Sequence, residues 1–180
     1  MKFTHSYLED AVSVFAYYKR LADQSMSRLT EEQLVQVLDP EMNSIALIVK
    51  HMAGNMRSRW TDFLTTDGEK PDRHRDQEFV LPAQTKEELL ATWEAGWAIV
   101  FGTLGQLTDA DLTRVVTIRR EQHSVMQAIN RQLSHYPYHC GQIVFLAKHF
   151  LSERWESLSV PRNRSAEFNI KVATGESSQR

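Results

Sequence analysis

The sequence SVMQAINRQLSHYPYHCGQIVFLAKHFL, residues 124–151, predicts one long amphipathic helix. Its apolar residues recur at intervals of three and four positions, which places them on one helix face. They are Val125, Ile129, Leu133, Tyr136, Cys140, Ile143, Ala147 and Phe150. Pro137 interrupts the helix and is expected to bend it, because proline lacks a backbone donor. A helix with one apolar face needs other elements to cover it, so its partners must lie elsewhere in the chain.

Three further segments have the same helical period: residues 3–28, 44–65 and 85–107. Capping signals support these limits, since Ser44 is a good N-cap and Thr85 forms a capping-box pair with Glu88. A short additional helix is expected after Thr30. Four long amphipathic helices with little strand signal predict an all-α four-helix bundle.

The remaining segments are predicted to be irregular. The stretch from Asp67 to Pro82 is polar and has turn signals at both ends, which predicts a long surface loop after the second long helix. Residues 115–118 are β-branched and form at most a brief extended piece. We expect a single domain over residues 1–170 and a disordered tail over residues 171–180.

Composition and charge narrow the class of protein. The 180 residues include 21 Lys and Arg against 23 Asp and Glu, and this balance gives no general attraction to nucleic acid or to anionic membranes. Cys140 is the only cysteine, so no internal disulfide can form and a reducing compartment is indicated. No run has the length of a transmembrane helix, and the first residues lack a signal-peptide core. The expectation is a cytoplasmic protein.

Three of the seven histidines are candidate metal ligands. His135 and His139 are four residues apart on the predicted helix 124–151, so their side chains share one face. His51 flanks the apolar stripe of the second long helix. Three neutral imidazoles would leave a coordination position open, as in catalytic metal sites. Each residue also has an ordinary alternative, because polar residues are common at the edge of a helix stripe.

The other chemistry-bearing residues have simpler interpretations. His5, His74, His123 and His149 are expected to be exposed. Cys140 points roughly 100° away from His139 around the helix axis, onto the apolar face, and is expected to be a buried structural thiol. Neither a nucleophile-elbow motif nor a glycine-rich phosphate loop is present in the sequence.

Two motifs resemble those of a known group of proteins. The segments KHMAGN, residues 50–55, and HYPYHCGQI, residues 135–143, resemble the DinB-like superfamily of four-helix-bundle proteins. The details of residues 57–60, 67–71 and 128–132 are most similar to an uncharacterised bacterial branch of that superfamily. The resemblance extends over about residues 3–170 and implies helices in up-down-down-up order.

The resemblance also implies a metal site and a class of chemistry. Relatives hold a divalent metal ion, often nickel or zinc, on one histidine of the second long helix and two of the fourth. By position these are His51, His135 and His139. Such proteins are often homodimers, and some transfer thiols such as bacillithiol or mycothiol or isomerise maleylpyruvate with a thiol cofactor. The implied cofactors are one zinc or nickel ion and a low-molecular-weight thiol.

Two classes of function remain open from the sequence. The first is a metal-dependent enzyme that acts on a small molecule by thiol transfer or hydrolysis, since the ion would lower the pKa of a thiol or water that it binds. Asn55, Arg131 and Gln142 are candidates for contacts with the ligands or substrate, or else solvated flank residues. The second is a non-catalytic metal-binding or interaction protein. In either case, neutral imidazoles predict metal loss below about pH 6.

Overall fold

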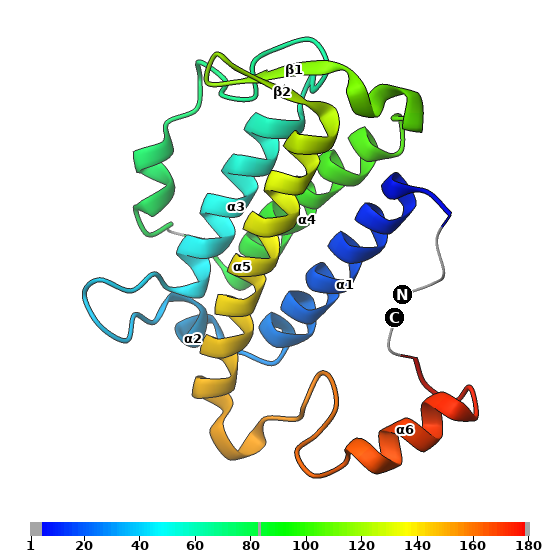
Figure 1. The fold of residues 1–180 in the computed structure, drawn as a ribbon. Helices are drawn as coiled ribbons and strands as arrows, with labels where there is room; N and C mark the ends of the chain where they lie inside the picture. The colour runs from blue at the N-terminus through cyan, green and yellow to red at the C-terminus, as the bar shows by residue number, and fades with distance from the viewer. Residues whose placement is uncertain (1–4, 83, 179–180) are drawn as a thin grey trace.

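The computed structural model describes residues 5–82 and 84–178 and is mostly helical. Four long helices lie side by side in it: α1 (Tyr7–Ser27), α3 (Ile45–Trp60), α4 (Lys86–Leu104) and α5 (Val125–Leu151) (Figure 1). All four correspond to predicted segments, and the described part of the chain is mostly helical, as predicted, but it also contains a small two-stranded sheet. Residues 3 and 4 of the first predicted helix lie outside the described residues.

The helix starts follow from local capping. Ser6, Ser44, Thr85 and Ser124 each accept a hydrogen bond from a backbone amide of the following first turn. Each bond satisfies an amide that has no partner within the helix. Helix α3 ends at Trp60, earlier than the predicted residue 65, because the chain turns there and Asp62 has a positive φ of 49°.

Contacts between residues of neighbouring helices show the directions of the helices. Ala53 and Trp60 of α3 meet Gly96 and Thr103 of α4, so these two helices run in the same direction. Lys19 of α1 binds Glu94 of α4, and Ser27 lies beside Lys86, which makes α1 antiparallel to α4. The segment between α3 and α4 therefore returns along the length of the bundle (Figure 1). This return segment, residues 61–85, is called the crossover below.

Short elements complete the described chain. They are the helices α2 (Glu31–Val35) and α6 (Ser165–Ala173), the 3-10 helices η1 (Arg75–Phe79), η2 (Asp109–Thr113) and η3 (Ser152–Arg154), and the strands β1 (Val115–Ile118) and β2 (Glu121–Ser124). The extended piece predicted at residues 115–118 is strand β1. It pairs antiparallel with β2, which the sequence analysis does not predict. Helix α6 extends three residues into the segment expected to form a tail.

The core is built from aromatic rings between the four long helices. Phe15 of α1 packs edge-on against Trp60 of α3 and Trp97 of α4, and it also contacts Tyr136 of α5. The indole N–H of Trp60 donates to the Tyr136 hydroxyl at 2.9 Å, so the polar atoms of both rings are satisfied inside the core. These residues hold α3 and α5 at a fixed separation beside the candidate site.

The crossover differs from the predicted surface loop. Glu78 in η1 is only 6% exposed, and the side chain of Arg73 is 4% exposed. Both are buried because they pair with each other, which removes most of the penalty for taking charges out of water. The prediction of a surface loop is therefore wrong for this part of residues 67–82. Within the described chain, no helix has the length and apolar character to cross a membrane.

Candidate metal centre

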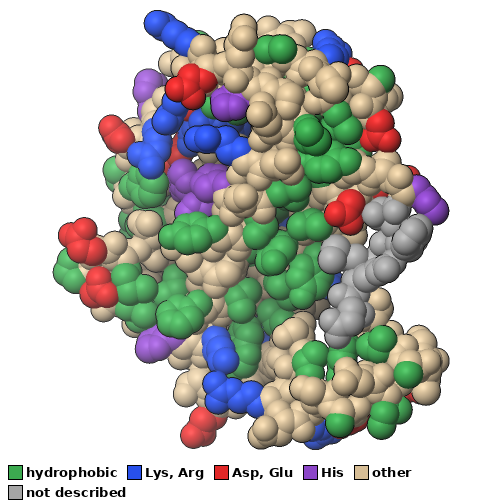
Figure 2. Space-filling model, viewed as in Figure 1, with side chains coloured by type: hydrophobic (Ala, Val, Ile, Leu, Met, Phe, Trp, Pro, Cys, Tyr) green, Lys and Arg blue, Asp and Glu red, His purple; other side chains and the backbone are tan. Residues whose placement is uncertain are grey.

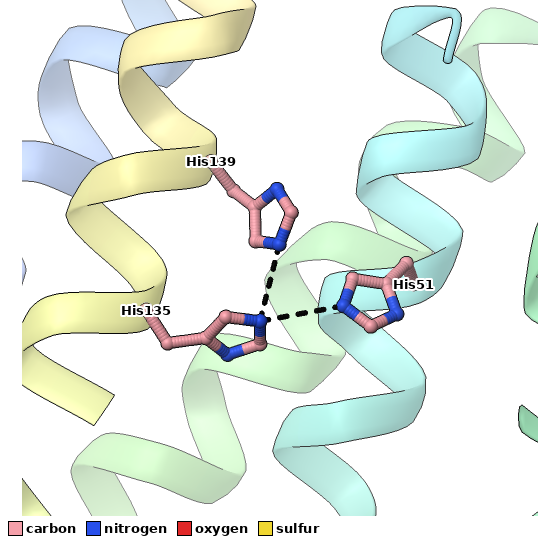
Figure 3. A group of neighbouring side chains, drawn as sticks. All are labelled: His51, His135 and His139. Carbon is pink, nitrogen blue, oxygen red and sulfur yellow. Dashed lines mark hydrogen bonds between the residues drawn. The ribbon is translucent and has the colours of Figure 1, made fainter. Parts of the chain in front are cut away.

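Three histidine side chains converge between α3 and α5 (Figure 3). The Nε2 atom of His135 lies 3.4 Å from Nε2 of His51 and 3.1 Å from Nε2 of His139. One nitrogen of each ring lies within 4.8 Å of the other two, an arrangement that could hold a metal ion. The three residues named from the sequence are thus brought together, with His51 buried and the other two half-buried.

The second nitrogen of each ring contacts an oxygen. Nδ1 of His51 lies 2.8 Å from a carboxylate oxygen of Glu78, and Nδ1 of His139 lies 2.7 Å from the amide oxygen of Gln142. Nδ1 of His135 faces the amide oxygen of Gln132 at a longer 3.4 Å. These oxygens are acceptors, so in the neutral ring the proton sits on Nδ1 and the lone pair on Nε2. Three lone pairs therefore point at one another.

Burial keeps the imidazoles of His135 and His139 neutral. It lowers the pKa of His135 to about 3, with the neighbouring His139 and His51 and then Arg59 and Arg73 adding to the effect. The pKa of His139 is also lowered by burial, although the hydrogen bond with Gln142 opposes this shift. Neutral imidazole is the form that binds metal ions, so the cluster is ready for a cation at neutral pH.

The spacing of the nitrogens suits a first-row divalent ion. Zinc–nitrogen bonds near 2.0–2.1 Å in tetrahedral geometry place two ligand nitrogens about 3.3 Å apart. Two of the three separations, 3.1 and 3.4 Å, bracket that value, and the third is within 4.8 Å. Nε2 of His135 lies in contact with the Nε2 atoms of both other rings, and three lone pairs gathered in this way are unfavourable unless a cation lies among them. The residues present therefore fit the metal site that the sequence resemblance implies.

Glu78 contacts His51 and is not among the residues predicted from the sequence. Its other oxygen accepts from Nε of Arg73 at 2.8 Å, and Nη2 of Arg73 bonds the oxygen that faces His51. Burial raises the pKa of Glu78, but the hydrogen bonds from His51 and Arg73 outweigh it and hold this pKa below its usual value. Glu78 is therefore an ionised carboxylate that orients the His51 ring and would strengthen it as a metal ligand.

Gly54 makes this contact possible. A Cβ atom at residue 54 would lie 2.5 Å from Oε1 of Glu78, closer than side-chain atoms approach. The glycine next to the ligand-bearing turn of α3 thus leaves room for the carboxylate to reach His51. It is part of the KHMAGN motif, and it is the one feature of the sequence that signals a close approach there.

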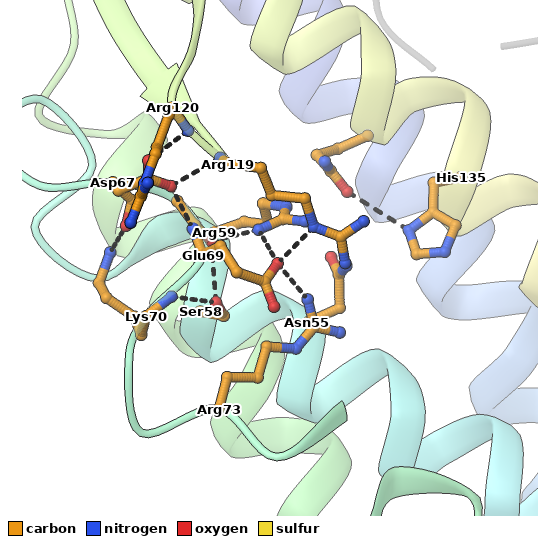
Figure 4. A network of polar contacts seen from close by, with 12 residues as sticks. Asn55, Ser58, Arg59, Asp67, Glu69, Lys70, Arg73, Arg119, Arg120 and His135 are labelled. Atoms are coloured by element: carbon orange, nitrogen blue, oxygen red, sulfur yellow. Dashed lines mark hydrogen bonds and ion pairs between the residues drawn. The ribbon is translucent and has the colours of Figure 1, made fainter. Parts of the chain in front are cut away.

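A second cluster of charged residues adjoins the histidines (Figure 4). Arg59 of α3, Arg73 of the crossover and Arg119 of the β-hairpin all bond the same oxygen of Glu69, at 2.9, 3.3 and 3.2 Å. Arg59 also donates to the backbone oxygen of Gly68. The cluster ties the crossover and the hairpin to the end of α3.

Both clusters line one cavity of about 580 Å³. Figure 2 shows histidine and basic side chains gathered around this hollow. Its walls include His51, Asn55, Arg59, Arg73, Arg75, Phe79, Arg119, Arg131, Gln132, Ser134, His135, Tyr138 and His139. The histidine cluster is therefore open to a molecule of moderate size, rather than enclosed like a structural metal site.

The other predicted site residues lie at or near the cavity, with different roles. Gln142 contacts His139, as above. Asn55 is buried on the cavity wall, and its side-chain oxygen accepts from the Tyr136 hydroxyl at 3.0 Å. Arg131 is exposed on the wall and contacts none of the three histidines. Gln132, which faces His135, is not among the predicted residues, although its spacing of three from a histidine is the same as that of Gln142.

Cys140 and three of the four other histidines have the burial that the sequence predicts. Cys140 is fully buried, and burial raises the pKa of its thiol to about 12, so it is a structural residue of the core. His5, His74 and His149 are exposed, whereas His123 is half-buried on β2. Arg75, on the polar segment, lies over the Phe79 ring with its guanidinium carbon 5.1 Å from the ring centroid.

The fold and the site together define a class of protein: a helical bundle with an open three-histidine cluster. Comparison with known families matches residues 2–164 to DUF1572, a family described as a protein of unknown function. The match covers nearly the whole chain, so the protein belongs to this family. No curated protein matches the chain.

Proposed function

We propose that the protein is a metal-dependent enzyme of the DinB-like type, with an up-down-down-up bundle, acting on a small molecule. The observation that carries the proposal is the convergence of three Nε2 lone pairs while each Nδ1 is held by an oxygen. Buried polar groups are normally arranged to satisfy one another. An arrangement that sets three acceptors against each other is best explained by a cation as their common partner.

The ion would supply Lewis acidity, which favours the anionic form of a thiol or water and stabilises negative charge in a transition state. His51, His135 and His139 would hold it. A set of three imidazoles suits zinc and nickel and leaves at least one position for an exchangeable molecule. An open position in a cavity favours catalysis over a purely structural site.

The other residues of the chain would orient and select. Glu78, Gln132 and Gln142 fix the tautomer and direction of the three rings. Asn55 uses its oxygen on Tyr136, which leaves its amide N–H groups for a molecule in the cavity. The aromatic core behind Tyr136 keeps water away from the inner side of the site.

Between the two reactions, the geometry favours thiol transfer over hydrolysis. The two oxygens of Glu78 are both engaged, one by Arg73 alone and one by Arg73 and His51. This carboxylate is therefore poorly available as a general base for activating water. A thiol needs less help, because its ordinary pKa of about 8.5 lies far below that of water. The co-substrate would be a low-molecular-weight thiol.

Metal analysis tests the first part of the proposal. Protein purified without a His-tag is expected to carry one divalent ion per chain, and the triple alanine variant of His51, His135 and His139 is expected to carry none. A variant with alanine at the exposed residues His74 and His149 is the matched control and should keep its metal. Equal metal content in all three proteins would contradict the site.

Thiol titration tests the reaction class. After loading with cobalt or nickel, addition of a low-molecular-weight thiol is expected to produce a sulfur-to-metal charge-transfer band that His135→Ala abolishes. No spectral change, with fast water exchange at the ion, would favour metal-assisted hydrolysis instead. If neither thiol nor water reaches the ion, the protein is a non-catalytic metal-binding or interaction protein.

We also propose that the protein is a homodimer, on the strength of the resemblance to the DinB-like superfamily. Light scattering is expected to give twice the chain mass of 20.8 kDa. A mass near 21 kDa at high protein concentration would contradict this proposal.

A further inference from the structure

The cavity beside the histidines holds an excess of positive charge. Five arginines line it: Arg59, Arg73, Arg75, Arg119 and Arg131. Three carboxylates of the described chain bond residues of this arginine group. Glu69 and Glu78 form ion pairs with it, and Asp67 caps the backbone amides of the hairpin turn. These five guanidinium groups outnumber the three carboxylates by two, before any metal ion is counted.

The carboxylates are shared rather than paired one to one. A single oxygen of Glu69 serves Arg59, Arg73 and Arg119. Glu78 divides its oxygens between Arg73 and His51. Like charges held this close repel one another unless further negative charge is present. The cluster therefore has an excess of positive charge that a bound anion would offset.

Several donors on the cavity wall have no partner. Within residues 5–82 and 84–178, Arg131 makes no hydrogen bond or ion pair. The side chain of Arg59 is only 7% exposed, and its Nε is buried without a hydrogen-bond partner. Buried guanidinium N–H groups are normally satisfied, so the unpartnered Nε–H of Arg59, whose side chain is more than nine-tenths buried on the cavity wall, points to a missing acceptor.

The hairpin turn adds a second line of support. Arg119 and Arg120 form a two-residue turn between β1 and β2, and both have positive φ, 53° and 67°. Asn-Gly is the usual choice for such turns, because other residues are strained there. Asp67 offsets the strain by accepting from both backbone amides at 2.8 Å. The turn places the Arg119 side chain on the cavity wall, whereas Arg120 does not line the cavity.

We propose that Arg59, Arg119 and Arg131 form a binding site for an oxyanion group, carboxylate or phosphate, of the small molecule that reaches the histidine cluster. This substrate class deepens the proposed function and rests on it. Guanidinium groups bind the two oxygens of such a group with paired N–H donors. Arg73, whose donors are occupied by Glu69 and Glu78, acts as a positioning residue. The arginines line a concave cavity, which has room for a small anion. The net charge of the chain is −2, so the protein as a whole does not attract a large polyanion such as a nucleic acid.

Calorimetry with two probes, succinate and inorganic phosphate, tests the proposal at low ionic strength. The wild-type protein is expected to bind at least one of them, and the tighter probe identifies the oxyanion. Arg119→Gln and Arg131→Gln are each expected to weaken binding several-fold, and the double variant at least tenfold. Arg120→Gln is the matched control, because it removes the same charge from the same turn outside the cavity. Unchanged affinity in the double variant, or no binding of either probe, overturns the proposal.

Repeating the titration with chelator-treated protein separates this site from the metal site. The arginine site should retain measurable affinity without metal, and its binding should weaken with added salt. Binding that requires metal and ignores both arginine substitutions would overturn the arginine site and leave the metal proposal standing. Anion binding in a chain that never takes up metal would support the arginine site and contradict the proposed function.

Discussion

Helices α3 and α5 present two very different surfaces to each other. On one side Trp60 and Tyr136 meet the ring of Phe15 and close an aromatic core. On the other side, one residue away from Tyr136, His135 faces a cavity lined by arginines. Burial of apolar rings contributes strongly to the stability of a fold. Buried ion pairs contribute little net stability, but they fix the orientation of the groups that they join. We infer that the aromatic side carries the stability and the charged side the function.

The largest expected effect is on the aromatic side. Phe15 is fully buried against three aromatic residues, so Phe15→Ala should lower the free energy of unfolding by about 3–5 kcal/mol. Chemical denaturation measures this loss. Phe145, which is 66% exposed on α5, provides the control, and Phe145→Ala should change stability by less than about 0.5 kcal/mol. Similar losses in both variants would remove the distinction between the two surfaces.

On the charged side, the expected effect is on metal affinity. Glu78→Gln removes the carboxylate that faces His51 and should weaken metal binding by about 10–100-fold, the usual effect of losing such a partner. Glu69→Gln is the matched control, because Glu69 also binds Arg73 but contacts none of the histidines. Competition with a chelator measures both affinities. Equal losses would mean that general charge, and not the contact with His51, determines affinity.

Two glycine-to-alanine substitutions compare a crowded position beside the histidine cluster with an open position on α4. Gly54→Ala adds a methyl group against Glu78, so metal affinity should fall several-fold as the carboxylate moves away from His51. In Gly102→Ala the new Cβ meets no atom within 4 Å, and the better helix propensity of alanine should raise stability by up to about 1 kcal/mol. Metal titration and thermal unfolding of both variants test this. Full metal affinity in Gly54→Ala would show that Glu78 is not held by a close fit.

The smallest effect concerns the metal-free protein at low pH. Burial first, and then the neighbouring charges, lower the pKa of His135 in the folded chain to about 3, against an ordinary value of 6.5. Between these values the unfolded chain binds a proton that the folded chain does not, so acidification favours unfolding. Stability should therefore decline as the pH falls from about 6.5 toward 3. His135→Gln should make the decline shallower and His149→Gln should not, as measured by denaturation at a series of pH values.

The helices of this fold could be predicted because their apolar residues follow one period over many turns. The histidine cluster could be named for a related reason, since His135 and His139 share a face by spacing and the motif around His51 adds the third. Gln142 could be named because it follows His139 by three residues, within one helical turn. Gln132 precedes His135 by three residues, so the same reasoning toward the N-terminus would have identified it.

Glu78 could not be found in this way. It lies 27 residues from His51 in a polar segment without a regular period, so only the three-dimensional return of the crossover brings the two together. The β-hairpin was missed for a different reason, because an Arg119-Arg120 turn lacks the glycine or asparagine that usually marks such a turn. Its stabilising partner, Asp67, is 52 residues away from Arg119.

The central claim is that three imidazoles bind one divalent ion, and X-ray absorption of the metal-loaded protein tests it most directly. For a zinc- or nickel-loaded sample, we expect three histidine nitrogens at about 2.0–2.1 Å, and two in the His51→Ala variant. The remaining scatterer should be a light atom that a small thiol replaces with sulfur. A spectrum with fewer than three histidines, or one that is unchanged by His51→Ala, would contradict the account.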